Sequence, residues 1–373
     1  MIDIVVVFGT RPDAIKMAPV VRALRESKRF NAKICVTGQH RELLHSVLQL
    51  FDITPDFDLN IMRPNQSLDD ATADILVRLG DVLDDSRPSL VLTQGDTTTT
   101  LAASMSAFYR KIPVGHVEAG LRSGNMFAPW PEEFNRRVAS MTTRFHFAPT
   151  AQARSNLIAE GIPEMHIHVT GNTVIDALQW VSTRIEASAE KVKSFDKMFD
   201  YLDRKRRIVV LTAHRRETFG DGFLHICRAI KRLAAREDVQ VVFPVHPNPN
   251  VRNIVNSELS GVDSVFLIEP LNYEPFVYLM RRASVLVTDS GGIQEEGPSL
   301  GKPVLVMRKV TERPEAVRAG TARLVGVETD IIVSQVERLL DDESEYAAMA
   351  RAINPYGDGR ASQRICAVLE REL

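Results

Sequence analysis

Short apolar runs alternate along the chain with longer stretches in which apolar residues recur every three or four positions. The short runs predict strands, and the longer amphipathic stretches predict helices. Strands are predicted at 2–8, 32–36, 90–93, 114–117, 145–148, 167–170, 208–211, 239–245, 265–268, 285–288 and 304–307. Helices are predicted at 12–25, 97–110, 223–235 and 276–283. Strands that alternate with helices indicate an α/β protein whose parallel sheets are covered on both faces.

The same pattern predicts two domains. A chain of 373 residues exceeds what one hydrophobic core usually serves. The stretch 186–207 is rich in lysine and lacks strand character, so we interpret it as a linker after a long helix and place the boundary near 170–205. The domains then span 1–172 and 173–354. Open α/β sheets bind ligands at the carboxyl ends of their strands, so we expect the site in a cleft between the domains.

Composition is that of an ordinary globular enzyme, and it narrows the partners. The net charge of −2 gives no general attraction to nucleic acid or acidic membranes. The three cysteines lie far apart in the sequence, which favours a reducing compartment. No apolar stretch approaches the ~20 residues of a membrane span, and the first residues lack the features of a signal peptide. We therefore expect a cytoplasmic protein that binds neither nucleic acid nor membrane.

The most informative segment is 289–296, DSGGIQEE, which follows an apolar run and leads into a predicted helix. Ser290, Gly291 and Gly292 stand where a helix presents bare backbone N–H groups, and such groups bind phosphate. Glycine lets the backbone approach closely because it has no Cβ. Glu296 lies about one turn further on, where a carboxylate can accept hydrogen bonds from ribose hydroxyls. The segment therefore predicts a nucleotide site.

The first predicted strand ends in the segment 8–16, FGTRPDAIK. Pro12 suits the first position of a helix, so Arg11 and Lys16 fall near the positive end of that helix, where cations gain little from the dipole. Two interpretations are open. The two side chains are either solvated surface charges or cations that await an anionic ligand.

Three acidic residues follow predicted strands or begin predicted helices in the first half: Asp96, Glu118 and Glu132. Taken singly each has an ordinary explanation, because Asp96 could only cap the next helix and Glu132 could only favour a first turn. Together they are expected to converge on one edge of a sheet. Carboxylates that converge in a cleft can have separated pKa values, which suits general acid and base work.

The second half supplies cationic and aromatic candidates. His214 with Arg215 and Arg216 forms a plausible pyrophosphate cluster, and metal binding by His214 and His246 is the alternative, although no metal-ligand motif accompanies them. Arg313 stands close to a predicted turn. Since no GxGxxG follows the first strand, a bound dinucleotide is not indicated.

Seven segments, at 8–16, 95–100, 116–122, 129–136, 214–217, 289–296 and 311–315, together resemble the non-hydrolysing UDP-N-acetylglucosamine 2-epimerases. The resemblance runs from residue 2 to about residue 362. It implies a GT-B-like fold of two Rossmann-like domains with an interdomain cleft, with the C-terminal helix at 355–373 packed back on the first domain. It also implies a homodimer that needs neither a metal nor another cofactor.

The activity that the resemblance implies is reversible C2 epimerisation of UDP-GlcNAc to UDP-ManNAc, which feeds surface polysaccharide synthesis. The C2 hydrogen is not α to a carbonyl, so the route is elimination of UDP to 2-acetamidoglucal and re-addition, with a base and an acid on opposite faces. By matching motif, Asp96, Glu118 and Glu132 are the acid/base candidates, and His214 joins the catalytic set. The substrate-binding candidates are Arg11, Lys16, Leu271, Phe276, Ser290, Gly291, Gly292, Glu296 and Arg313. Which acid serves which face stays open.

The chain departs from the family pattern at a few positions, among them Asp13, where the family usually has Glu. A related diacetamido-uronate epimerase would share the mechanism, so the substrate detail stays open. Some relatives bind a second UDP-GlcNAc as an activator, and the segments that could form such a site here carry Gln39, His40, Arg63, Gln66 and His246.

Three other functions remain in competition. A GT-B glycosyltransferase would share the nucleotide half but would need an acceptor site. A UDP-sugar-binding regulator would need no catalytic acids. Neither the glycosyltransferase nor the regulator therefore explains why three acids converge. A hydrolysing epimerase would release free ManNAc and UDP.

Overall fold

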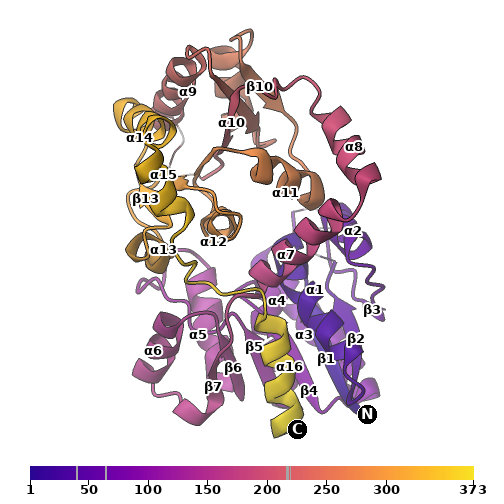
Figure 1. The fold of residues 1–373 in the computed structure, drawn as a ribbon. Coiled ribbons are helices and arrows are strands. Elements are labelled where there is room, and N and C mark those ends of the chain that lie inside the picture. The colour runs from indigo at the N-terminus through magenta and orange to yellow at the C-terminus, as the bar shows by residue number, and fades with distance from the viewer. Residues whose placement is uncertain (39–40, 64, 216–217, 219) are drawn as a thin grey trace. The chain divides into compact units, whose positions relative to one another are not determined.

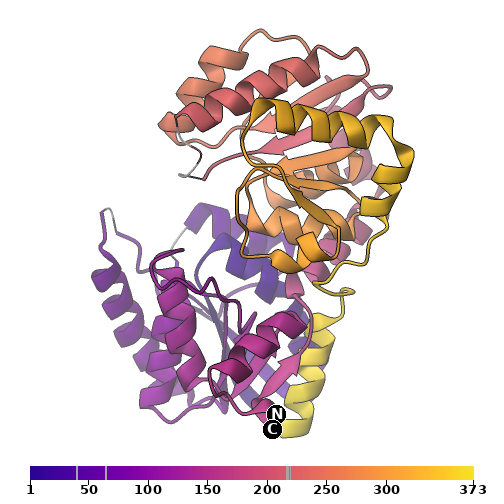
Figure 2. The same cartoon turned by 90° about the vertical axis from the view of Figure 1, so that its left-hand side faces the viewer.

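The computed structural model describes residues 1–38, 41–63, 65–215, 218 and 220–373, and the chain divides into two compact units. Unit 1 comprises Met1–Gln179 with Tyr356–Leu373, and unit 2 comprises Trp180–Pro355. The division falls inside helix α7, Thr173–Glu186, within the predicted boundary region of 170–205 and a few residues after the predicted limit at 172. Each unit has its own parallel sheet and its own core (Figures 1 and 2).

Unit 1 is built on a seven-stranded parallel sheet with the order β3-β2-β1-β4-β5-β6-β7. Its strands are β1 Ile2–Phe8, β2 Phe30–Val36, β3 Phe57–Asp58, β4 Leu90–Gln94, β5 Val114–Val117, β6 Phe145–Ala148 and β7 Ile167–Val169. Its helices are α1 Arg11–Glu26, α2 Arg41–Leu50, α3 Leu68–Ser86, α4 Thr98–Tyr109, α5 Glu132–Thr142, α6 Ala151–Ala159, the 3₁₀ turn η1 Glu164–His166, the first half of α7, and α16 Ala361–Glu372.

The strands of unit 1 are apolar on both faces because helices cover both sides of the sheet. Ile4 and Val6 on one face and Val5 and Val7 on the other are all buried. The strand order reverses between β1 and β4, which is the Rossmann-like arrangement. Loops after these two neighbouring strands therefore meet at one edge of the sheet, where open α/β sheets bind ligands.

Helix α16 brings the end of the chain back onto unit 1. It packs against α1, and the Oγ of Ser27 donates to Glu370 at 2.7 Å. The buried carboxylate of Asp176 accepts from the backbone N–H groups of Ala361 at 3.1 Å and Ser362 at 2.8 Å, so a side chain of α7 caps α16. Both chain ends consequently lie at the same end of unit 1 (Figures 1 and 2).

Unit 2 contains a six-stranded parallel sheet with the order β10-β9-β8-β11-β12-β13, which reverses between β8 and β11. Its strands are β8 Arg207–Thr212, β9 Val239–Pro244, β10 Val265–Ile268, β11 Val285–Thr288, β12 Val304–Val306 and β13 Ala322–Leu324. Its helices are α8 Ala189–Met198, α9 Asp221–Ala234, α10 Pro249–Leu259, α11 Tyr273–Arg282, α12 Gly291–Ser299, α13 Pro314–Arg318, α14 Thr329–Asp341 and α15 Glu343–Ala350.

The predicted alternation of strands and helices is confirmed, and every predicted strand coincides with a strand of one of the two sheets. The linker interpretation of 186–207 is wrong, because this stretch contains α8. Ser188 caps α8 through its side chain, which accepts from the N–H of Lys191, and Phe195 is buried. The segment 186–207 has the composition of a linker because lysines lie on the exposed face of this short amphipathic helix.

No helix within the described ranges is both long enough and apolar enough to cross a membrane.

Candidate functional site

The candidate site of unit 1 forms where β1 and β4 end side by side. Gly9 follows β1, and a Cβ on it would lie 2.2 Å from the Oγ1 of Thr37 and 2.4 Å from that of Thr99. These two hydroxyls lie 3.1 Å apart, within hydrogen-bond distance. Only glycine fits above them, so the chain can turn tightly from β1 into α1. That turn places Arg11 and Lys16 on the first turns of α1.

Glu118 is the most tightly held of the predicted acids. It follows β5 with a φ of 66°, and only 8% of it is exposed. One carboxylate oxygen pairs with the ammonium of Lys16 and accepts from Asn172 at 3.0 Å, and the other accepts from the amide of Gln94. The interpretation of Lys16 as a solvated surface charge is therefore wrong. Gln94 and Asn172 were missed, although both stand at strand ends as the acids do.

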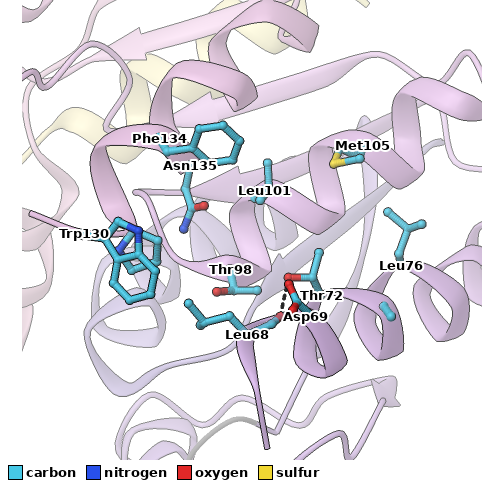
Figure 3. Close-up of a pocket in the computed structure, with 12 residues that line it drawn as sticks. Leu68, Asp69, Thr72, Leu76, Thr98, Leu101, Met105, Trp130, Phe134 and Asn135 are labelled. Atoms are coloured by element: carbon cyan, nitrogen blue, oxygen red, sulfur yellow. Dashed lines mark hydrogen bonds between the residues drawn. The ribbon is translucent and has the colours of Figure 1, made fainter. Parts of the chain in front are cut away.

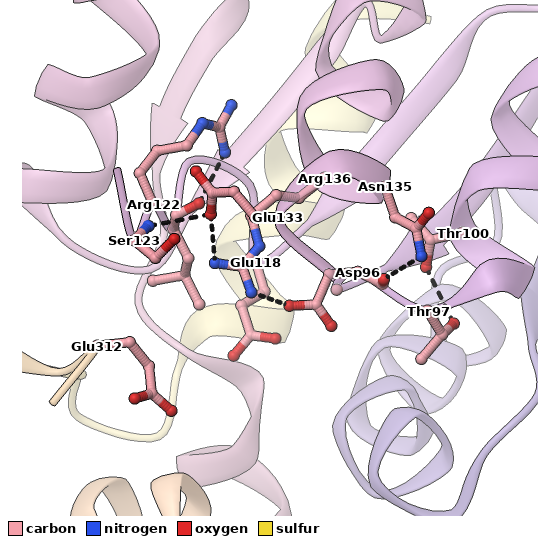
Figure 4. A network of polar contacts seen from close by, with 12 residues as sticks. Asp96, Thr97, Thr100, Glu118, Arg122, Ser123, Glu133, Asn135, Arg136 and Glu312 are labelled. Carbon is pink, nitrogen blue, oxygen red and sulfur yellow. Dashed lines mark hydrogen bonds and ion pairs between the residues drawn. The ribbon is translucent and has the colours of Figure 1, made fainter. Parts of the chain in front are cut away.

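Asp96 lies next to this group, because the preceding residue, Gly95, packs against Glu118. A Cβ placed on Gly95 would lie 3.6 Å from the Oε2 of Glu118. The helix that follows has Thr97 as its N-cap residue, so the interpretation of Asp96 as only an N-cap is wrong. Its carboxylate instead pairs with Arg136, and its carbonyl accepts from the side-chain amide of Asn135 at 2.9 Å, as Figure 4 shows. Helix α5 thus holds Asp96 from two positions.

Glu132 begins α5, as the prediction of a helix after Pro131 required. Its Oε2 is buried and has no hydrogen-bond partner among the described residues. The following Glu133 is fully buried and was missed by the sequence reasoning. It accepts from the N–H of Ser123 at 3.0 Å and pairs with Arg136 and Arg137 at 3.2 and 3.1 Å. Glu133 is therefore the residue that anchors α5, which leaves Glu132 as the candidate for chemistry.

A buried histidine supports the turn that carries Asp96. His116 lies in β5 with its Nε2 2.7 Å from the carbonyl oxygen of Gly95. Burial lowers the pKa of His116 to about 4, so the ring is neutral near pH 7 and its Nε2 is the donor in this bond. In β6 the neighbouring His146 is also buried, and burial lowers its pKa to about 3.

An apolar groove of about 470 Å³ lies between α3, α4 and the segment at the start of α5. Figure 3 shows Trp130 and Phe134 on one side of it and Leu68 and Leu76 of α3 on another. Asn135, which binds the carbonyl of Asp96, also lines the groove. The segment that carries Glu132 therefore has the acid-bearing turn on one side and an open apolar surface on the other.

The candidate site of unit 2 forms where β8 and β11 end side by side. Asp289, fully buried after β11, accepts from the backbone N–H groups of His214 at 2.7 Å and Arg215 at 2.8 Å. Its other oxygen lies 3.1 Å from the Nδ1 of His214. Burial opposes ionisation of Asp289, but these bonds from His214 and Arg215 lower its pKa below the usual range. Asp289 therefore orients His214, and Arg216, the third residue of that predicted cluster, lies outside the described part of the chain.

The predicted sequence of strand, Ser-Gly-Gly and helix is confirmed. Ser290 is the N-cap residue of α12 but makes no side-chain capping bond, so the first N–H groups of the helix carry no such cap. A Cβ on Gly291 would lie 3.0 Å from the Cζ of Arg313, whereas one on Gly292 would meet only ordinary contacts, the nearest being the Oε2 of Glu296 at 3.6 Å. Arg313 therefore packs directly over the glycine turn.

Glu296 is buried on α12 and accepts from the hydroxyl of Tyr273, the first residue of α11. This bond fixes the start of α11, which carries the half-buried Phe276, against the predicted ribose carboxylate. Leu271 is half-buried in the preceding loop. The structure thus brings the predicted uracil segment beside Glu296. Tyr273, which makes the connection, was missed because the sequence gives no sign of its partner.

An arginine cluster surrounds Glu312. The carboxylate pairs with Arg313 at 3.0 Å, with Arg215 at 3.3 Å and with Arg308. Burial by itself would raise the pKa of Glu312, but the three guanidinium groups hold it at about 2. Arg313 also binds Glu295 at 2.9 Å. Glu312 is thus a permanent anion that holds the cations beside the glycine turn.

Three of the five residues predicted for a second ligand site, Arg63, Gln66 and His246, lie within the described ranges. Gln39 and His40 lie outside the described residues. Gln66 donates to Asp74 of α3 at 2.9 Å, and Arg63 pairs with the same carboxylate. His246 belongs to unit 2, where its ring stacks on that of His214 with the centroids 5.7 Å apart.

The stacked rings of His214 and His246 are the two histidines of the alternative interpretation, in which they bind a metal ion. Burial and then the nearby His214 lower the pKa of His246. Within the described ranges, no group of three or more His, Cys, Asp or Glu side chains is arranged to hold a metal ion.

Two Rossmann-like domains with these strand orders define a GT-B-like fold. The sequence model of the family described as UDP-N-acetylglucosamine 2-epimerase matches residues 22–370. The chain is 55% identical to the UDP-N-acetylglucosamine 2-epimerase of Salmonella typhimurium (strain LT2) over 98% of both chains. It therefore belongs to the UDP-N-acetylglucosamine 2-epimerase family, which confirms the resemblance noted from its motifs and makes the protein an isomerase.

Solved structures agree with this assignment. The crystal structure of UDP-GlcNAc 2-epimerase from Neisseria meningitidis bound to UDP-GlcNAc has a TM-score of 0.94 and 50% sequence identity, and the match covers both chains completely. That of the Methanocaldococcus jannaschii enzyme in complex with UDP-GlcNAc and UDP has a TM-score of 0.84 and 31% identity, and the match covers 99% of this chain and all of that one.

Proposed function

We propose that the protein interconverts UDP-GlcNAc and UDP-ManNAc by eliminating UDP to 2-acetamidoglucal and adding it back after protonation of the opposite face. The observation that carries the proposal is the acid cluster of unit 1. Glu118 and Asp96 are each paired with a cation on neighbouring turns, and family membership supplies the reaction. Elimination needs a base and an acid held at fixed positions, and these ion pairs hold them.

Asp96, Glu118 and Glu132 take the acid and base roles in this proposal. Glu132 is the acid whose carboxylate is least engaged by described partners, because one of its oxygens is buried without a hydrogen bond. Such an oxygen is the position from which a proton can be exchanged with a substrate, since no protein donor has to be displaced. Lys16 and Arg11 lie on α1 beside Glu118 and supply positive charge to the anionic substrate.

The leaving group is UDP, and the residues of unit 2 bind it. The uncapped N–H groups of α12 at Ser290, Gly291 and Gly292 bind the diphosphate, with Arg313 over the same turn. Glu296 accepts from the ribose hydroxyls, and Leu271 and Phe276 contact the uracil. His214, oriented by Asp289, completes the anion site and stabilises charge that develops as UDP leaves. No metal and no other cofactor takes part.

Incubation with UDP-GlcNAc in D2O, without an acceptor and followed by proton NMR, tests the proposal. Deuterium at C2 together with the appearance of UDP-ManNAc is the expected result. Unchanged UDP-GlcNAc would contradict epimerisation and favour a glycosyltransferase or a binding protein. Free ManNAc with UDP would show the hydrolysing reaction instead. If a diacetamido-uronate is the true substrate, exchange will occur only when that sugar nucleotide is supplied.

Biological context completes the proposal. We place the enzyme in the cytoplasm as a homodimer that supplies ManNAc units for surface polysaccharide. Size-exclusion chromatography with light scattering should give twice the chain mass of 41.7 kDa.

A second UDP-GlcNAc bound near Gln39, His40, Arg63, Gln66 and His246 is a further proposal. Initial rates with pure UDP-ManNAc test it, since full turnover without added UDP-GlcNAc would rule the activator out.

A further inference from the structure

Asp13 is a buried carboxylate to which the proposed reaction gives no role. It lies at the third position of α1, and only 5% of it is exposed. Its Oδ2 accepts from the backbone N–H groups of Thr10 at 3.1 Å and Gly9 at 3.4 Å, and from the hydroxyl of Thr97 at 3.4 Å. One oxygen atom therefore joins the turn after β1 to the turn after β4, which carries Asp96.

A second capping box in the same unit shows which of these features are ordinary. In α3, Ser67 and Asp70 exchange the same reciprocal bonds as Thr10 and Asp13 do in α1. Asp70 is exposed, and its bonds to Ser67 lower its pKa. Burial instead raises the pKa of Asp13 to about 6, and the charge of Asp96 acts in the same direction. Helix capping alone does not require a buried acid beside another acid.

Thr97 supplies the other half of the observation. It is the N-cap residue of α4, where a threonine hydroxyl usually accepts from an N–H of the first helical turn. Here Thr97 makes no side-chain capping bond, and its hydroxyl contacts the carboxylate of Asp13 instead. Asp13 thus keeps its capping bonds and adds a contact between the two turns, for which Thr97 gives up its usual capping bond.

We propose that Asp13 is a positioning residue for Asp96: its carboxylate fixes the turn of Asp96 and Thr97 against the start of α1, which carries Arg11 and Lys16. This inference rests on the proposed function, in which Asp96 exchanges protons with the substrate. The other charges nearby are already engaged, because Lys16 pairs with Glu118 and Arg136 pairs with Asp96.

The effect of Asp13 on stability separates this role from a structural one. A carboxyl group whose pKa is raised in the folded state holds its proton more tightly there than in the unfolded chain. The protonated form of Asp13 therefore stabilises the fold relative to the ionised form. This contribution to the free energy of unfolding is lost as the pH rises from about 4 to about 6. Asparagine keeps an acceptor oxygen and has no buried charge, so Asp13→Asn is not expected to lower the Tm at pH 7.5. Its neutral oxygen accepts weaker hydrogen bonds than a carboxylate does, so it should hold the turn of Asp96 and Thr97 less firmly.

The test compares Asp13→Asn, Asp13→Glu and, as the matched capping-box control, Asp70→Asn. For each we measure kcat and KM for UDP-GlcNAc between pH 5 and 9, the Kd for UDP and the Tm. Asp13→Asn should lose about 10-fold or more in kcat with an unchanged Kd for UDP. Wild-type kcat is expected to decline below about pH 6, where Asp13 gains a proton, and the variant should lack that decline. Asp13→Glu should recover most of the rate, and Asp70→Asn should match wild type.

A kcat for Asp13→Asn within about twofold of wild type, or a decline below pH 6 that persists unchanged, overturns the inference. So does a Tm that falls together with kcat, because that result marks a structural cap. If Asp13→Asn does not fold, Thr97→Val tests the same contact and should give the same loss of kcat. Wild type that incorporates no deuterium at C2 in D2O would instead refute the proposed function, which the variants do not affect.

Discussion

The two units hold their charges in opposite ways. In unit 1 the acids are the groups proposed to act on the substrate, and cations hold them, as Lys16 holds Glu118 and Arg136 holds Asp96. In unit 2 the groups proposed to bind the substrate are cations, and acids hold them, as Glu312 and Glu295 hold Arg313 beside the glycine turn. Proton transfer needs carboxylates that are free to change protonation, whereas an anion site needs positive charge that never changes.

The difference predicts that variants in the two units will fail in different ways. Loss of an acid in unit 1 should lower turnover and leave UDP binding intact. Loss of a cation in unit 2 should weaken binding first. The predictions below test that division.

The largest effect is expected from the acids of unit 1. Glu118→Gln, Asp96→Asn and Glu132→Gln should each lose at least ~100-fold in kcat, because in the proposed reaction each removes a group that gives or takes a proton. The Kd for UDP, measured by calorimetry, should stay near the wild-type value. Asp84→Asn is the matched control, since Asp84 also pairs with an arginine of unit 1, Arg110. A near-normal rate in any one of the three acid variants would remove that residue from the catalytic set.

A smaller effect is expected from Arg313 of unit 2. Arg313→Ala removes a guanidinium that lies over Gly291, and a charge-assisted hydrogen bond to a phosphate is worth about 1.5–3 kcal/mol, so the Kd for UDP should rise about 10- to 100-fold. Arg323→Ala is the control, because Arg323 pairs with Glu345 elsewhere in the same unit. Equal Kd values for the two variants would mean that Arg313 is only structural.

The effect expected to be smallest near neutral pH is a pH dependence of stability that belongs to unit 1. Burial lowers the pKa of His116 to about 4 and that of His146 to about 3, so the unfolded chain binds these protons more readily than the folded one. The two neutral histidines contribute fully to the free energy of unfolding above about pH 6.5. This contribution is lost as the pH falls toward 4, and for His116 it amounts to about 3 kcal/mol. Asp13 acts in the opposite direction over part of this range.

Thermal melts between pH 4 and 8 check this prediction. The Tm of wild type should fall below about pH 6.5, and His146→Phe should flatten the decline because it removes one of the two groups that gain a proton on unfolding. His225→Asn, at a half-buried histidine of unit 2, is the control and should keep the wild-type slope. An identical slope in His146→Phe would contradict the assignment.

Most of the fold could be predicted from the sequence because the strands of covered parallel sheets are continuous apolar runs. The short strands β3 and β13 were missed, since Phe57–Asp58 and Ala322–Leu324 are too short to form such a run. Helix α8 was taken for a linker because its lysines dominate its composition, and the burial of Phe195 depends on packing that the local sequence does not show.

The candidate site likewise has parts that a local sequence pattern predicts and parts that depend on contacts between distant segments. The turn at Ser290, Gly291 and Gly292 could be found from the sequence because its chemistry lies in consecutive backbone groups. The partners of the acids could not. Asn172 reaches Glu118 across 54 positions of the chain, and Arg136 reaches Asp96 across 40. Such contacts follow from strand order, which brings distant loops to one sheet edge, and no local pattern reports them.

The backbone at Glu118 has a consequence for how this family diverges. Its φ of 66° lies in the left-handed region, which costs a non-glycine residue about 1 kcal/mol and which glycine or asparagine adopts more readily. Glutamate at this position therefore carries a conformational cost that either residue would relieve. In a descendant that retains the fold but has lost turnover, we expect glycine or asparagine at this position before the nucleotide turn changes. The residue at this one position should then help to separate active relatives from inactive ones.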